Sequence, residues 1–168
     1  MIKLNKRAFW LPNFVADTVL DIDADALQRA GITHVVFDLD ETLVRRQTNV
    51  LTPRYRRFIH GLQAAGFTVM LGTNSRRNVT DLSTSLGIVA VQPRGLSYKP
   101  LPSFYTRVMT VADASPQHIV MVGDHIINDI AGANLSGLTT VLIKRRHSKR
   151  SRLRQAYIYL AIKFSGTT

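Results

Sequence analysis

Residues 34–43 have the sequence HVVFDLDETL. The first four residues form a short run that is mostly apolar and β-branched, which is typical of a strand buried inside a sheet. We therefore predict a strand over His34–Phe37. This strand ends at Asp38, and a second carboxylate, Asp40, follows two residues later. Two acidic side chains at the tip of a buried strand indicate a functional site.

The rest of the chain alternates between strand and helix signals. Four more strands are expected, at Phe67–Leu71, Ile88–Val91, Ile119–Val122 and Thr139–Ile143. Four helices are expected, at Pro53–Ala65, Arg76–Leu86, Leu101–Ala112 and Asp129–Leu135. This alternation predicts a three-layer, Rossmann-like α/β fold, in which helices cover both faces of a mainly parallel five-stranded sheet.

Polar residues follow the predicted strands. In such sheets the ligand site lies beyond the carboxyl ends of the strands. Four separate stretches bring a hydroxyl, an amide, a lysine and several carboxylates to this edge: Asp38–Thr42, Gly72–Ser75, Lys99, and Gly123–Asp129. Arginines also follow strand ends and could receive an anionic substrate or simply be solvated: Arg45, Arg46, Arg76, Arg77 and Arg94.

The residue types at this edge suit phosphoryl transfer. A carboxylate can attack phosphorus and form an aspartyl-phosphate, and Asp38 is placed for that role. Asp40 is offset enough to give a proton to the leaving group and then to activate water. Carboxylates repel a phosphate, so Mg²⁺ is expected as cofactor, held by Asp38, by Asp124 and at Asp40 through a nearby main-chain carbonyl.

Other residues are expected to hold the phosphate. Thr73, Asn74 and Lys99 are predicted to neutralise and hydrogen-bond its oxygens, where charge gathers during transfer. Asp129 is predicted to act without touching the phosphate, through a hydrogen bond to Lys99 or to a metal-bound water.

These stretches resemble the four motifs of haloacid dehalogenase (HAD) phosphatases, in the family's order: Asp38–Leu43, Thr73–Asn74, Lys99, and Gly123–Asp124 with Asp129. The run Gly123–Asp129, followed by Gly132, Asn134 and Gly137, is similar to the YqeG group, which is related to the mitochondrial HAD-type phosphatidylglycerophosphatase. The resemblance implies that Asp38 is the nucleophile and Asp40 the acid/base. His125 and Glu41 depart from the residues expected at those positions.

The spacing of the motifs leaves no room for a cap domain. Residues 43–72, which number 30, and residues 75–98, which number 24, are consumed by core helices and strands. The site should therefore be open. An open site suits a phosphate presented by something large, because small metabolites usually need a lid that excludes water.

Positive charge is concentrated at the C-terminal end. The net charge is +11, and residues 144–163 hold eight basic residues and no acidic one. We divide the chain into a HAD core with an N-terminal leader (1–143) and a basic amphipathic extension (144–168). The extension could bind an anionic membrane surface through residues 144–164, or it could pack on the core with its charges solvated.

Composition excludes several classes of protein. The absence of cysteine excludes disulfides, thiolate metal sites and cysteine nucleophiles. No apolar run approaches the roughly 20 residues of a membrane-spanning helix, and the first residues make a poor signal peptide, so a cytoplasmic location is expected, on the inner face of the membrane if the extension binds it.

The expected function is a magnesium-dependent phosphomonoester hydrolase. A large or membrane-presented substrate such as phosphatidylglycerophosphate is favoured, with nucleic-acid or phosphoprotein ends as the alternative, because a basic extension suits any polyanion. A non-catalytic binding module is the third hypothesis, and the complete set of catalytic residues argues against it. The oligomeric state cannot be predicted.

Overall fold

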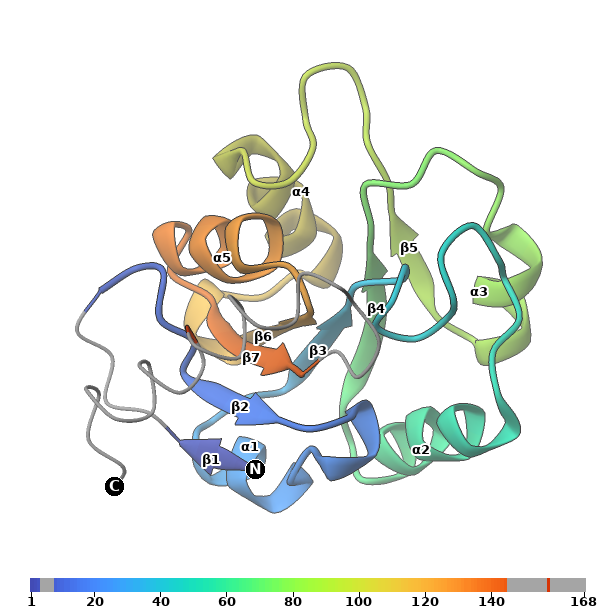
Figure 1. The fold of residues 1–168 in the computed structure, drawn as a ribbon, viewed down its shortest axis with the longest axis horizontal. Helices are drawn as coiled ribbons and strands as arrows, with labels where there is room; N and C mark the ends of the chain where they lie inside the picture. Colours follow the sequence, from blue (N-terminus) through green and yellow to red (C-terminus); the bar gives the residue numbers. More distant parts are fainter. Residues whose placement is uncertain (4–7, 145–156, 158–168) are drawn as a thin grey trace.

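The structure is a computed structural model that describes residues 1–3, 8–144 and 157. A seven-stranded sheet forms its centre, in the order β1-β2-β7-β6-β3-β4-β5 (Figure 1). The strands are β1 (Ile2–Lys3), β2 (Phe14–Ala16), β3 (His34–Phe37), β4 (Thr68–Gly72), β5 (Val89–Val91), β6 (Ile119–Gly123) and β7 (Thr139–Ile143). Six strands are parallel, and β1 pairs antiparallel with β2.

Helices cover both faces of the sheet and make the three predicted layers. They are α1 (Ala24–Arg29), α2 (Pro53–Ala64), α3 (Thr80–Leu86), α4 (Pro102–Ala112) and α5 (Gly132–Leu135), with 3₁₀ turns η1 (Val19–Asp21) and η2 (Pro116–His118) and a π-helix, η3 (Ile126–Ala131). Figure 1 shows α4 and α5 on one side of the sheet and α1 and α2 on the other. The fold class is therefore the α/β class predicted from the sequence.

Alternation along the strands explains the two layers of core. In β3, Val35 and Phe37 join the core cluster that contains Leu27 of α1 and Ile59 of α2. Val36 points to the opposite face and packs with the α4 cluster. Successive side chains of a strand face opposite sides of a sheet, so a strand that is buried on both faces must be apolar throughout.

The sheet is larger than the five strands predicted. The missed parallel strand, β2, extends the sheet beyond β7, where Phe14 pairs with Val141. Asn13 fixes this pairing through hydrogen bonds to Thr140. Its side-chain Oδ1 accepts from the Thr140 backbone amide at 3.0 Å, and its backbone amide donates to Thr140 Oγ1 at 3.1 Å. Three residues bounded by polar ones carry too little pattern to be recognised as a strand.

Two helices also differ from their predicted bounds by more than one residue. The helix predicted from Arg76 begins at Thr80, because Arg77 and Asn78 form side-chain contacts of their own before it. The helix predicted at Asp129–Leu135 is the end of a longer segment, which starts as the π-helix at Ile126 and becomes α-helical at Gly132.

Within residues 8–144 the connections between strands hold no cap domain. β3 and β4 are joined through α2, β4 and β5 through α3, and β5 and β6 through α4. None of the helices in the described part of the chain is both long enough and apolar enough to cross a bilayer.

Candidate active site

Three buried carboxylates meet at the carboxyl edge of the central strands. Asp38 follows β3, and its amide donates to Val122 of β6 at 2.8 Å, which continues the ladder between these strands. Asp124 follows β6, and Asp129 lies in η3. One oxygen from each carboxylate lies within 4.8 Å of the other two. Three hard oxygen donors at this spacing could hold a divalent cation such as Mg²⁺.

Lys99 inserts its ammonium group among these carboxylates. Its Nζ donates to Asp38 Oδ1 at 2.6 Å, to Asp129 Oδ1 at 2.7 Å and to the carbonyl of Gly72 at 2.8 Å. These contacts use all three of its donors. Only 3% of the residue is exposed, so the two ion pairs are shielded from solvent. Lys99 therefore links β4, the end of β3 and η3 at a single point.

The protonation of Asp38 and Lys99 reflects this arrangement. Burial raises the pKa of Asp38 to about 6; the Lys99 ammonium opposes the rise and the Asp129 charge adds to it. Burial alone would lower the pKa of Lys99, but the Asp129 and Asp38 carboxylates outweigh it and hold that pKa above its usual value. Lys99 thus stays charged and partly neutralises the carboxylate cluster.

Backbone contacts fix the position of Asp129. Its Oδ2 accepts from the His125 amide at 2.9 Å, while Oδ1 accepts from Lys99. His125 in turn accepts the Asn128 amide at its Nδ1, at 3.2 Å, and so caps the first turn of η3. Gly123 leaves the necessary space, because a Cβ there would lie 2.3 Å from the Asp129 carboxyl carbon. His125 therefore has a capping role that the sequence did not reveal.

Asn74 contacts the backbone of Lys99. Its Nδ2 donates to the Lys99 carbonyl and its Oδ1 accepts the Lys99 amide, both at 2.8 Å. Thr73 is 1% exposed, and its Oγ1 accepts the Ser75 amide at 3.1 Å. The structure thus brings Thr73, Asn74 and Lys99 to the site from two strand ends. In this structure Asn74 holds the Lys99 backbone in position. The phosphate contact predicted for the Asn74 side-chain amide stays a prediction.

Asp40 lies apart from the buried carboxylate cluster. Its Oδ2 accepts from Arg77 Nη1 at 2.8 Å, and its Oδ1 accepts the Gln47 amide at 3.0 Å. The side chains of Asp40 and Arg77 are 28% and 22% exposed, so this ion pair is partly open to solvent. Asp129, and not the Asp40 side chain, accompanies Asp38 and Asp124 in the cluster. A metal contact at Asp40 through the main chain stays a prediction.

Arg77 is a residue of the candidate site that sequence reasoning did not single out. Its other donors bind Asn49 Oδ1 at 2.7 Å, Ser75 Oγ at 3.1 Å and the Thr48 carbonyl at 2.8 Å. These bonds tie the loop after β3 to the loop after β4. The sequence offered Arg77 as one of five arginines after strand ends, and no local signal distinguished it from the others.

Tyr105 of α4 contacts η3, the segment that carries Asp129. Its hydroxyl donates to the Asn128 carbonyl, and its ring is fully buried. Burial, together with the charges of Asp129 and Asp38, raises the pKa of Tyr105. Gly132 allows this approach, since a Cβ there would meet the ring at 2.8 Å.

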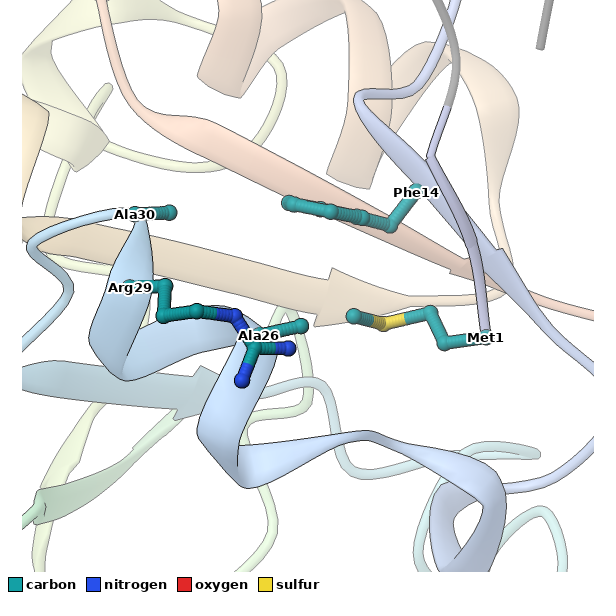
Figure 2. Close-up of a pocket in the computed structure, with 5 residues that line it drawn as sticks. All are labelled: Met1, Phe14, Ala26, Arg29 and Ala30. Carbon is teal, nitrogen blue, oxygen red and sulfur yellow. The ribbon is translucent and has the colours of Figure 1, made fainter. Parts of the chain in front are cut away.

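A separate cavity of about 210 Å³ lies between the N-terminal strands and α1. Figure 2 shows the residues that line it: Met1, Phe14, Ala26, Arg29 and Ala30. Its lining is apolar except for Arg29, so it offers no carboxylate, hydroxyl or imidazole for phosphoryl transfer.

Comparisons with known proteins show the family to which the chain belongs. Residues 3–137 match the family model of haloacid dehalogenase-like hydrolases. The chain is 25% identical over 138 residues to "Probable phosphatase YqeG" of Bacillus subtilis, covering 82% of this chain and 78% of that protein. It is 30% identical over 144 residues to the chloroplastic phosphatidylglycerophosphate phosphatase 1 of Chlamydomonas reinhardtii, covering 80% of this chain but only 52% of that protein.

A solved structure shares the fold. The magnesium-bound HAD-hydrolase YfnB of Bacillus subtilis superposes with a TM-score of 0.53 at 16% identity, over 78% of this chain and 99% of that one. The chain described here belongs to the haloacid dehalogenase-like hydrolases. Within that family it is an enzyme of the phosphatase type, similar to YqeG and to phosphatidylglycerophosphate phosphatase.

The Arg77 contacts predict a positioning role for this residue. Arg77→Gln is expected to lower kcat for a soluble aryl phosphate by about 10²-fold, because Asp40, the predicted proton donor, would lose its 2.8 Å partner and a positioned proton donor contributes about that much or more. Arg77→Lys should restore part of the loss, and Arg57→Gln, exposed on α2, should match the parent. Steady-state kinetics would measure this, and parental kcat in Arg77→Gln would contradict the role.

Proposed function

We propose that the chain is a magnesium-dependent phosphomonoester hydrolase that acts through an aspartyl-phosphate at Asp38. The observation that carries this proposal is the buried cluster of Asp38, Asp124 and Asp129 with the Lys99 ammonium between two of them. A single buried lysine balances one of the three negative charges. Membership of the HAD-like hydrolases supports the same chemistry.

The residues present fit Mg²⁺. The cluster offers only carboxylate oxygens, the ligands that Mg²⁺ prefers, and the described residues of the site offer it no thiolate or imidazole. Asp38 and Asp124 would hold the ion, with Asp129 behind them, already engaged by Lys99 and the His125 amide. The bound ion would supply positive charge that lets the anionic phosphate approach the carboxylates.

The protein's own groups account for both halves of the reaction. In the first, an oxygen of Asp38 forms a bond to phosphorus, the ester P–O bond breaks, and the leaving oxygen takes a proton from Asp40. In the second, water gives a proton to Asp40 and attacks phosphorus, which releases phosphate and regenerates Asp38. Lys99 and Thr73 stabilise the charge on the phosphoryl oxygens throughout.

The proposed substrate is a phosphate group on a lipid, with phosphatidylglycerophosphate as the leading candidate. The absence of a cap domain within residues 8–144 leaves the site open to a large substrate. The Chlamydomonas relative is named for this lipid and matches 80% of this chain, although the chain spans only about half of that protein. Nucleic-acid or phosphoprotein ends remain the second candidate, supported by the net charge of +11.

The basic extension is proposed to bind an anionic membrane surface from the cytoplasmic side. Residues 145–156 and 158–164 of this segment lie outside the described residues. Tyr157 is described: its hydroxyl donates to the Trp10 carbonyl and its ring packs beside the cluster that contains Ile130. Burial raises the pKa of Tyr157 to about 12.

Reversing the charge of Arg150, Arg152 and Arg154 should weaken sedimentation of the protein with anionic vesicles. Unchanged sedimentation would exclude a membrane-binding role for the extension.

A hydrolysis screen tests the proposed function. Phosphate release is measured from phosphatidylglycerophosphate in vesicles, from 5′- and 3′-phosphorylated oligonucleotides and from an aryl phosphate, each with Mg²⁺ and with EDTA. We expect Mg²⁺-dependent release from the lipid and from the aryl phosphate. Preference for the oligonucleotides would select the second substrate class. Release that is equal in EDTA, or none from any substrate, would contradict the proposed function.

A further inference from the structure

Exposed apolar side chains gather at the edge of the sheet that holds the site. Ten large hydrophobic residues are exposed in the described part of the chain, and five of them follow the carboxyl ends of β3, β5 and β6. We call these five the docking rim: Val50, Leu96, Tyr98, Leu101 and Ile127. Single exposed leucines are normal on protein surfaces, but these five lie in the segments that follow β3, β5 and β6, and the same segments contain Asp38, Lys99 and Asp124.

The most exposed member, Leu96, lies at the tip of a small hairpin. Arg94 and Ser97 exchange two backbone hydrogen bonds, at 3.1 and 3.0 Å, and Gly95 at φ +58° makes the turn between them. Figure 1 shows this loop, between β5 and α4, projecting from the top of the molecule. Leu96 is 83% exposed. Lys99 follows the hairpin by two residues, so the hairpin tip is close in sequence to the buried cluster of Asp38, Asp124 and Asp129.

Exposed arginines follow the carboxyl ends of β3, β4 and β5, at the same edge of the sheet. Arg45, Arg46, Arg76 and Arg94 are all exposed. A hollow of about 480 Å³ at the base of the hairpin is lined by Arg76, Gln92, Pro93 and Gly95. Apolar side chains that project singly from separate loops, next to arginines, suit the interface of an anionic bilayer, which accepts them without a complementary shape. A protein interface would instead need a contiguous, closely packed patch.

We propose that the docking rim and its arginines seat the site on the surface of an anionic bilayer. Leu96 enters the region between headgroups and acyl chains, and the arginines lie at the level of the lipid phosphates. The open edge of the sheet then faces the membrane, so a phosphate on a lipid headgroup reaches Asp38 without leaving the bilayer. This inference rests on the proposed function, whose substrate it places at a lipid surface.

Sedimentation of the full chain with vesicles tests this surface. The vesicles contain phosphatidylglycerol and phosphatidylcholine, and Leu96→Asp is compared with Val111→Asp. Val111 is also exposed, at 47%, but it lies at the far end of α4, toward the opposite edge of the sheet. We expect Leu96→Asp to weaken partition by about tenfold or more, since it replaces an inserted apolar group with a charge. Val111→Asp should sediment like the parent.

Fluorescence gives a second measurement. The chain has one tryptophan, Trp10, so Leu96→Trp in a Trp10→Phe background reports on the hairpin tip alone. We expect its emission to shift to shorter wavelength with phosphatidylglycerol vesicles and to change little with phosphatidylcholine alone. The basic extension is intact in all these variants, so its contribution is common to each of them.

Three outcomes would overturn the inference. Equal partition of Leu96→Asp and Val111→Asp is one, and an unshifted emission from the hairpin tip in the presence of phosphatidylglycerol vesicles is another. The third is a change in the solution mass of Leu96→Asp with parental vesicle binding, which would make the docking rim a protein-binding surface. Failure of the proposed function would give a different result from all three. The parent protein would not hydrolyse the aryl phosphate, while its binding to vesicles would be unaffected.

Discussion

Asp38→Asn is expected to abolish turnover, lowering kcat for an aryl phosphate by about 10⁴-fold or more, as removal of a nucleophile does in other enzymes. The amide has nearly the shape of the carboxylate but cannot form the phosphoryl bond. It also removes one of the anionic ligands proposed for Mg²⁺. Phosphate release measured over hours, at saturating substrate and Mg²⁺, would resolve a loss of this size.

Folding of this variant can be checked independently. Asp38 is 8% exposed, and burial raises its pKa to about 6, so its charge is costly in the folded state. Replacing it with a neutral amide should leave the unfolding temperature unchanged or higher. Asp25→Asn, exposed on α1, is the matched control and should keep full activity. Magnesium-dependent hydrolysis at the parental rate by Asp38→Asn would exclude the aspartyl-phosphate mechanism.

The central strands could be predicted because they are buried on both faces, so their consecutive residues are mostly apolar or β-branched. His34–Phe37 and Thr139–Ile143 are observed with the bounds expected from the sequence. Both lie between neighbouring strands and beneath helices, so apolar and β-branched residues occupy nearly every position. The short strand Phe14–Ala16 could not be predicted in this way. Its place is fixed by the bonds of Asn13 to Thr140, which is 127 residues away in sequence.

The site could be predicted only as far as its residues follow strand ends. Asp38, Lys99 and Asp124 were expected at one edge, and the structure places them there. The direction of a side chain depends on its tertiary partners and not on its own position in the chain. Asn74 therefore contacts the Lys99 backbone, and Asp40 contacts Arg77, which is 37 residues away in sequence; the sequence indicates neither contact.

Lys99→Met is expected to destabilise the folded protein by about 3–5 kcal/mol in EDTA, because it leaves two buried carboxylates without their shared cation. Methionine occupies a similar volume, so the loss reports charge and hydrogen bonding more than packing. The loss should be larger at pH 8 than at pH 5. Burial already raises the pKa of Asp38 to about 6, so at acid pH this group takes up a proton and the repulsion with Asp129 falls.

Mg²⁺ should restore part of this stability, because an ion that binds only the folded carboxylate cluster stabilises it by mass action. Chemical denaturation with and without Mg²⁺ measures both effects. Lys144→Met is the matched control: Lys144 Nζ lies 2.7 Å from Asp17 Oδ1, as close as Lys99 is to Asp129, but its side chain is 35% exposed and that of Asp17 60%. Exposed pairs contribute about 0–1 kcal/mol, so Lys144→Met should change stability little and independently of Mg²⁺. Equal, Mg²⁺-independent losses in the two variants would show that the buried cluster neither depends on the Lys99 charge nor binds the ion.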